Sequence, residues 1–258
     1  MYVVSLFDKT DNYKKVSDQL TANGINHEKF VAVDGRGTPA EKEIKRQEFE
    51  RLYGVKIPKE GANIPASSLT IGNILMYRHM IDNGWERMLI LEDDVVLNND
   101  INKEFLDGIN SIKKQDWDLL YLSCGGSCGH KGVSTRKSKN NKFPSTWMQH
   151  SSWDPDIGKI FVKHPFDIRY PCSKTECVKV SKSISVAPYP GGTFGYAISL
   201  KGAKKMLKYI GKTINNHIDQ YLMHAVDEGV CRALAFDPPI LWHDQGMLIA
   251  GQSTIEWV

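Results

Sequence analysis

The sequence lacks the features of several protein classes. It contains no apolar run near the ~18 residues of a membrane-spanning helix, and no Asn-x-Ser/Thr glycosylation site. Residues 1–7 form an apolar run without a basic flank or a small-residue cleavage site, which predicts a first strand rather than a signal peptide. We therefore expect a cytoplasmic protein without a transmembrane segment.

Neither positive nor negative charge is in large excess, since the formal net charge is +3 over 258 residues. Basic residues cluster only at 131–142, among Ser, Asn and Gly, which is typical of a solvated loop; contact with an acidic partner is the alternative. No basic stripe interleaved with aromatic residues recurs elsewhere. Nucleic-acid binding is therefore not predicted.

Cysteine is sparse, and its odd count of five favours free thiols in a cytoplasmic protein. Neither the pair Cys124 and Cys128 nor the pair Cys172 and Cys177 has the tight Cys-x-x-Cys spacing of a zinc site. The sequence leaves open two alternatives, a zinc site from both pairs with His130, and a disulfide between Cys172 and Cys177.

Two familiar phosphate-binding motifs are missing. No Gly-x-Gly-x-x-Gly follows the first strand, which disfavours a dinucleotide-binding fold of that type. Gly211-Lys212-Thr213 looks like the end of a P-loop, but Met206 occupies the position of the required first glycine.

The most informative stretch that is present spans residues 88–97. Apolar residues flank Glu92-Asp93-Asp94 on both sides, which predicts a buried strand that ends in three acids. Such carboxylates are costly to desolvate unless a divalent cation or ordered donors contact them. Oxygen ligands suit Mn²⁺ or Mg²⁺, which also bind phosphate oxygens. We predict a metal and diphosphate site at the tip of a central strand; a solvated turn before a helix capped by Asp100 or Asn102 is the alternative.

The beginning of the chain predicts a parallel sheet. A strand within residues 1–7, a helix that Asp11 caps and that ends at Gly24, and a strand over 27–33 form a right-handed βαβ pattern. Ligands bind at the carboxyl ends of such strands. Residues 5–8, which include Ser5 and Leu6, and Asp34 lie at these ends, so a nucleotide is expected there.

Three later segments add candidates. The glycines of Gly191-Gly192-Thr193 permit close approach of the backbone to a ligand. Asp219 falls in the first turn of a helix. If Asn216 is the N-cap, Asp219 is stabilised at position N3, and a chemical role is compatible with the same position. His243 is a candidate to complete an octahedral metal site with Asp94 and diphosphate oxygens.

The chain is predicted to form a single domain over 1–258. Helices are expected at 39–53, with an exposed surface, at 69–83, beside the acidic strand, and at 101–114. The irregular segment 123–190 is predicted to be an insertion that forms a lid or binding region. Its aromatic residues include Trp147, Trp153 and Tyr170.

Together these motifs resemble glycosyltransferase family 25, the group that includes bacterial lipooligosaccharide galactosyltransferases and the collagen hydroxylysine galactosyltransferases. The resemblance covers most of the chain outside 123–190. The segments that carry it are Ser5 to Asp11, Phe30 to Gly35, the helix before the acids, Leu89 to Leu97, Trp117 to Leu120, Gly192 to Ser199 with Gly202-Ala203, His217-Ile218-Asp219 and Pro238-Pro239.

The resemblance implies an α/β fold of the GT-A type, Rossmann-like and built to bind nucleotide sugars, with a mostly parallel central sheet flanked by helices. It also implies a UDP-sugar donor, dependence on Mn²⁺ with Mg²⁺ as the alternative, and transfer with inversion. Carried onto this chain, it makes Asp94 the direct metal ligand and lets Asp34 reach the nucleoside. Glu92 and Asp93 would contact ribose, metal-bound water or the donor sugar, and Ser5, Leu6, Gly192 and Thr193 would belong to the donor site.

Inverting transfer needs a base for the acceptor hydroxyl and a Lewis acid for the departing diphosphate. We assign Asp219 as the base, and the ion at Asp94 with His243 as the Lewis acid. The expected sugar is a hexose, galactose or glucose, and the acceptor a glycan or a hydroxylysine-containing glycoprotein. Trp147, Trp153 and Tyr170 of the 123–190 insertion either stack on the acceptor sugar or pack in the core.

One departure from the family concerns the helix before the acids. The family commonly has Gly-Cys-x-x-Ser-His there, whereas this chain has Gly72 followed by Asn73-Ile74-Leu75-Met76-Tyr77-Arg78-His79. The donor sugar is therefore open. Two alternative functions remain at this point, a non-catalytic carbohydrate-binding module and a metal-dependent nucleotidyltransferase.

Overall fold

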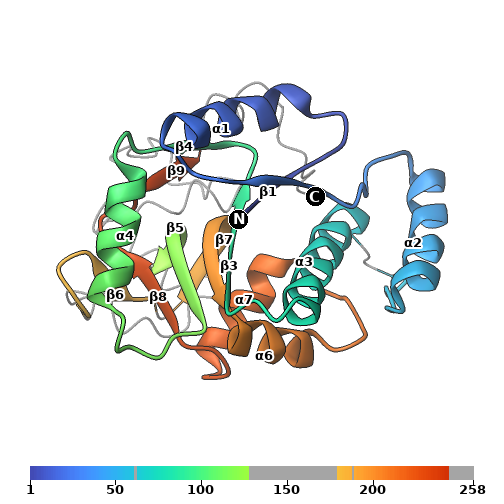
Figure 1. The fold of residues 1–258 in the computed structure, drawn as a ribbon. Coiled ribbons are helices and arrows are strands. Elements are labelled where there is room, and N and C mark those ends of the chain that lie inside the picture. Colours follow the sequence, from blue (N-terminus) through green and yellow to red (C-terminus); the bar gives the residue numbers. More distant parts are fainter. Residues whose placement is uncertain (61–62, 128–178, 188, 244–258) are drawn as a thin grey trace, which may run out of the picture.

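The computed structural model describes residues 1–60, 63–127, 179–187 and 189–243. A central seven-stranded sheet has helices on both faces (Figure 1). The strand order is β2-β1-β3-β7-β5-β8-β6. The strands are β1 (Tyr2–Ser5), β2 (Glu28–Val31), β3 (Arg87–Glu92), β5 (Leu119–Ser127), β6 (Ile184–Val186), β7 (Tyr189–Ser199) and β8 (Ala233–Phe236).

Most strands of this sheet run in one direction. β1 pairs in parallel with β2 and β3, and β5 pairs in parallel with β8, whereas β7 is antiparallel to both β3 and β5, and β6 is antiparallel to β8. Five of the seven strands therefore point the same way, and β7 and β6 point the other way. The predicted α/β fold with a mostly parallel sheet is confirmed.

Alternation along the strands assigns the helices to the two faces. Tyr2 and Val4 pack with α3 (Ile64–Asp82), α6 (Leu200–Ile210) and α7 (Ile218–Asp227). Val3 packs on the opposite face with α1 (Thr10–Ala22) and α4 (Ile101–Ser111). The helix α2 (Pro39–Tyr53) lies outside α3, at the border of the molecule (Figure 1).

The helix α2 matches its predicted span and exposure. Thr38 and Glu41 form a capping box at its start, and only Phe49 is buried along its length.

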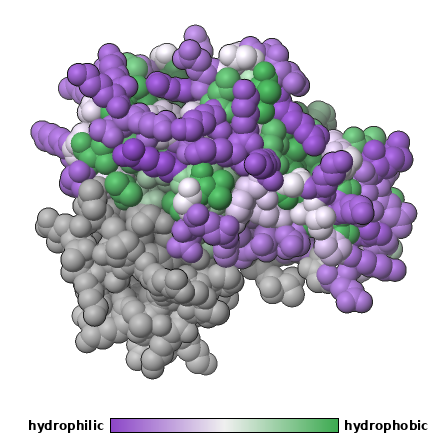
Figure 2. Space-filling model, turned by 90° about the horizontal axis from the view of Figure 1, so that it is seen from below, coloured by the Kyte–Doolittle hydropathy of each residue, from purple (hydrophilic) through white to green (hydrophobic). Residues whose placement is uncertain are grey.

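Hydrophilic side chains cover most of the described surface seen from below, with smaller apolar areas between them (Figure 2).

Three predicted helix starts were wrong. The helix α3 begins at Ile64 rather than 69, because Asn63 accepts a hydrogen bond from the Ala66 N–H and Pro65 suits the first turn. The helix α7 has His217, not Asn216, as its N-cap. Lys9 rather than Asp11 precedes the first turn of α1.

The chain leaves the main sheet at the three acids. β3 ends at Glu92, a turn follows, and β4 (Val95–Leu97) pairs with β9 (Leu241–His243) in a separate two-stranded antiparallel sheet. The acids therefore occupy the junction between two sheets.

Parts of the predicted insertion 123–190 are strands, since β5 continues to Ser127 and both β6 and the start of β7 fall inside this range. Residues 128–178, with Trp147, Trp153, Tyr170 and three of the cysteines, lie outside the described residues. Cys231 is a buried free thiol. Among the described helices, none combines the length and apolar composition that a membrane crossing requires.

Candidate functional site

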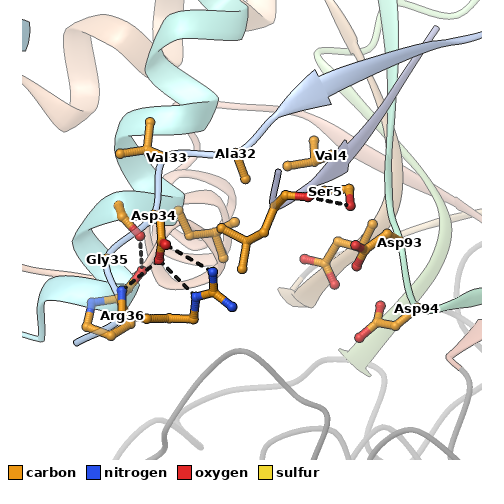
Figure 3. Close-up of a pocket in the computed structure, with 14 residues that line it drawn as sticks. Val4, Ser5, Ala32, Val33, Asp34, Gly35, Arg36, Asp93 and Asp94 are labelled. Atoms are coloured by element: carbon orange, nitrogen blue, oxygen red, sulfur yellow. Dashed lines mark hydrogen bonds and ion pairs between the residues drawn. The ribbon is translucent and has the colours of Figure 1, made fainter. Parts of the chain in front are cut away.

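Three parallel strands end beside one another at the candidate site. Ser5 of β1 lies opposite Val31 of β2, and Val4 lies opposite Glu92 of β3. The residues that follow these strands therefore meet at one edge of the sheet. Six of the predicted donor and metal residues line a single pocket there (Figure 3). They are Ser5, Leu6, Asp34, Glu92, Asp93 and Asp94.

The first turns of α3 form another wall of this pocket, through Pro65, Ser68 and Leu69. Gly35 packs directly against this helix, because a Cβ atom at Gly35 would lie 2.6 Å from the Ile64 carbonyl oxygen and 2.7 Å from Ser68 Oγ. Any larger residue would separate the end of β2 from α3. The positive end of the α3 dipole thus borders the pocket.

The acids at the end of β3 are half-buried and close to one another. Burial raises the pKa of Asp93, and the charge of Asp94 raises it further, while a hydrogen bond from Ser5 opposes both effects. Within the described ranges, no group of three or more His, Cys, Asp or Glu side chains is arranged to hold a metal ion. A cation at this edge would therefore take part of its coordination from a ligand's oxygens, as Mg²⁺ and Mn²⁺ do with phosphates.

Gly192 and Thr193 do not line the pocket, although they lie beside the acids. β7 is antiparallel to β3 with Gly195 opposite Leu91, which brings Thr193 to the end of β3. The Thr193 hydroxyl donates a hydrogen bond to Glu92. Gly192 has φ +77° and its Cβ would meet the Phe194 ring, so local backbone conformation accounts for this glycine. Thr193 thus orients Glu92 from the neighbouring strand.

Asp34 faces the pocket together with Arg36, a residue that the sequence analysis missed (Figure 3). Arg36 donates from Nε to Asp34 Oδ1 at 3.0 Å and from Nη2 to Asp34 Oδ2 at 3.0 Å. It also holds both carboxylate oxygens of Asp8, at 3.1 and 2.8 Å. These bonds lower the pKa of Asp34, so both acids stay ionised around the guanidinium.

His243 lies close to Asp94 along the backbone. It is paired with Val95, the residue directly after Asp94, through the β4–β9 ladder. The two predicted metal residues are thus neighbours across two strands, although the His243 side chain lies outside the description.

Asp219 is not among the residues that line the pocket. It occupies the second position of α7, where its Oδ1 accepts the Gln220 N–H at 3.0 Å. Burial raises the pKa of Asp219, and the charge of His217 opposes this rise. Burial raises the pKa values of Tyr121 and Tyr196, and smaller contributions come from the charge of Asp219 at Tyr121 and from that of Glu92 at Tyr196.

Asp219 and Glu92 therefore each influence one member of the Tyr121 and Tyr196 pair. Tyr121 and Tyr196 face each other across β5 and β7, with ring centroids 5.9 Å apart. α7 packs on β7, and a hydrogen bond of 3.1 Å from Thr70 Oγ1 to the Asn216 carbonyl joins α3 to the segment before α7. The base candidate is thus anchored to the same helix that walls the pocket.

The residues that sequence reasoning missed have a common origin. Pro65, Ser68 and Leu69 fell near or before the predicted helix start, which was placed too late. Asn63 followed by Pro65 is a helix-start signal that would have identified this turn. Arg36 had no such signal, since a charged residue after a strand is ordinarily solvated.

The sequence is similar to a family model and to several known proteins. The sequence model described as "Glycosyltransferase family 25 (LPS biosynthesis protein)" matches residues 1–227. Procollagen galactosyltransferase 1 of Danio rerio is 19% identical over 279 residues, covering 100% of this chain and 39% of the relative. A glycosyltransferase 25 family member of Aedes aegypti is 24% identical over 238 residues, covering 84% and 31%.

Procollagen galactosyltransferase 2 of Mus musculus is 21% identical over 211 residues, covering 80% of this chain and 27% of the relative. The chain thus spans at most about two fifths of the length of these relatives. The family match, in contrast, extends from β1 through α7 and includes the whole candidate site except His243. On this evidence, the chain belongs to glycosyltransferase family 25.

Proposed function

We propose that this protein is a metal-dependent inverting glycosyltransferase that moves a hexose from a UDP-sugar to a hydroxyl group of a glycan or a hydroxylysine-containing glycoprotein. The observation that supports this most is the single pocket where the carboxyl ends of β1, β2 and β3 gather Ser5, Asp34 and the three acids. Family membership supports the reaction class. The names of two relatives favour galactose as the sugar and a procollagen-like polypeptide as the acceptor.

The residues at the end of β3 fit a Mn²⁺ or Mg²⁺ ion. These ions are commonly held by one or two carboxylates, with substrate phosphates and water completing the coordination. Asp94 is the proposed direct ligand, with Asp93 beside it and His243 on the adjoining strand. When bound, the ion supplies positive charge that stabilises the departing diphosphate.

Asp219 is the proposed base. Its carboxylate takes the proton of the acceptor hydroxyl as that oxygen bonds to the anomeric carbon, on the face opposite the nucleotide. The bond from this carbon to the β-phosphate oxygen breaks, UDP leaves with the bonding electrons, and the configuration inverts. A pKa raised by burial suits this role, because a base works best when its pKa lies near the working pH.

A screen of UDP-sugars for hydrolysis in the presence of Mn²⁺ tests the proposal. We expect UDP release from one UDP-hexose, loss of that release with EDTA, and transfer of the sugar with inversion once an acceptor is added. Glycan binding without cleavage of any sugar nucleotide would instead indicate a carbohydrate-binding module. Release of pyrophosphate from a nucleoside triphosphate would indicate a nucleotidyltransferase.

A further inference from the structure

We propose that the planar face of the Arg36 guanidinium is the surface on which the nucleobase of the donor stacks, with Asp34 and Asp8 acting as positioning residues for Arg36. This inference rests on the proposed function, because it requires a nucleoside diphosphate in the pocket. It assigns the base contact to Arg36 and gives Asp34 an indirect role.

The hydrogen bonds of Arg36 leave its face, rather than its edge, for a ligand. A guanidinium has five N–H groups, and four of them already donate to Asp34 and Asp8. A bidentate grip on a phosphate needs a free edge with two N–H groups. The side chain is nevertheless 36% exposed and lines the pocket. Guanidinium planes stack well on aromatic rings, and a nucleobase is such a ring.

Charge also separates the two ends of the pocket. Arg36 is flanked by two carboxylates, and Lys45 Nζ lies 3.9 Å from Asp34 Oδ1. The two positive and two negative charges cancel, so this cluster is neutral as a whole. A neutral cluster has little attraction for a diphosphate. The end at Asp93 and Asp94 is where a divalent ion would attract the phosphates. The uncharged base is therefore expected at the Arg36 end.

The spacing of the strands agrees with this orientation. β2 and β3 both flank β1, so their carboxyl ends lie two strand spacings apart, about 10 Å. Arg36 follows β2 and the acids follow β3, on opposite sides of the pocket (Figure 3). A ribose bridges a base and a diphosphate over a separation of this order.

The Arg36 backbone is held as firmly as its side chain. The Arg36 N–H donates to Asp34 Oδ1 at 2.9 Å, and Lys45 Nζ donates to the Arg36 carbonyl oxygen at 2.7 Å. Gly35, directly before it, packs against α3. A side chain fixed in this way is already organised for binding and loses little entropy when a ligand arrives.

Calorimetry with UDP and with inorganic pyrophosphate, each with Mn²⁺, and competition by uridine test this assignment. For Arg36→Lys, which keeps the charge but loses the plane, we expect about tenfold weaker binding of UDP and uridine, and pyrophosphate binding within about twofold of wild type. Asp8→Asn, which loosens the guanidinium, should weaken UDP and uridine by about two- to fivefold and leave pyrophosphate unchanged.

Arg46→Lys is the matched control, because Arg46 is likewise held between two carboxylates, Glu43 and Glu50, but lies on α2 outside the pocket. It should bind all three probes as wild type does. Circular dichroism would verify that each variant is folded.

Three results would overturn the inference. Unchanged UDP and uridine binding in Arg36→Lys would remove the contact while leaving the proposed function intact. Equal weakening of UDP and pyrophosphate would show that Arg36 acts on the phosphates. If wild-type protein binds neither UDP nor uridine with Mn²⁺, the proposed function and this inference fail together.

Discussion

The two halves of the sheet use their polar side chains differently. In β2, β1 and β3, the acids follow the strand ends and line a pocket. In β7 and β5, polar groups lie within the core: the Tyr77 and Tyr196 hydroxyls are 2.7 Å apart, and Tyr196 donates to Asn73. Position along the strands explains the contrast, because the acids lie at the carboxyl ends of parallel neighbours, whereas Tyr196 is paired with Tyr121 inside β7 and β5.

Two acidic segments that carry the family resemblance illustrate the same difference. Asp118, 1% exposed, accepts hydrogen bonds from Lys205 Nζ at 2.6 Å and from the Arg232 N–H at 2.9 Å. Asp94 lies in the pocket at a junction between sheets. Motif membership alone therefore does not separate a structural acid from a binding one; the burial and partners of each do. The following predictions test this division.

The largest effect is expected at the metal end of the pocket. Asp94→Ala should lower transfer on the order of 10³-fold and abolish metal-dependent UDP binding in calorimetry, because the proposed direct ligand is gone. The thermal midpoint should remain near that of wild type. Asp100→Ala, which changes an exposed acid before α4, is the control. Unchanged turnover in Asp94→Ala would remove this residue from the mechanism.

Asp219→Asn should lower kcat by about 10²- to 10³-fold, since general-base catalysis contributes an effect of this size. UDP binding should not change, because Asp219 is not among the residues that line the pocket. Asp227→Asn, an exposed acid at the other end of α7, is the control. Wild-type kcat in Asp219→Asn would contradict its role as the base.

The pH dependence of the reaction should respond to His217. Asp219 works deprotonated, so activity should fall as the pH drops through its raised pKa. The charge of His217 holds this pKa down, so His217→Gln should move the acidic limb of the kcat profile to higher pH and leave the plateau unchanged. A limb that stays in place or moves to lower pH would refute this coupling.

A smaller effect, on stability alone, is expected in the half of the sheet that contains β7 and β5. Lys205→Met leaves the buried Asp118 carboxylate without its cation, which should lower the free energy of unfolding by about 1–3 kcal/mol. Lys201→Met is the matched control: Lys201 pairs with Asp116, both are more than half exposed, and such pairs contribute about 0–1 kcal/mol. UDP affinity should be unchanged in both variants. Weakened UDP binding in Lys205→Met would break the proposed division.

The smallest effects concern two fully buried tyrosines that face each other. Tyr196→Phe removes a hydroxyl bonded to Asn73 and Tyr77, and should cost about 1–2 kcal/mol in urea unfolding. Tyr121→Phe removes a hydroxyl that has no hydrogen-bond partner among the described residues, and should change stability by about 0.5 kcal/mol or less. Equal losses in the two variants would contradict this view of the core.

Local patterns predicted the half of the sheet with β1, β2 and β3 well. The βαβ pattern at the start of the chain and the acids after an apolar strand placed Ser5, Asp34 and Asp94 at one edge, because chain order and strand direction follow from local periodicity. The placement of β7 between β3 and β5 depends on pairing between distant segments, and the sequence analysis did not predict it. The role of Arg36 depends on Asp8, 28 residues away, so no local pattern could reveal it.

The central position of β7 has a consequence for synthesis of the chain. Both neighbours of β7 precede it in the sequence, so β3 and β5 leave the ribosome long before the strand that joins them. Until residues 189–199 emerge, β3 has one side with unpaired amide and carbonyl groups, and β5 has two, because its other neighbour β8 follows β7 in the sequence. Such unpaired edges are templates for aggregation. A fragment ending at residue 127 should therefore be poorly soluble when expressed alone.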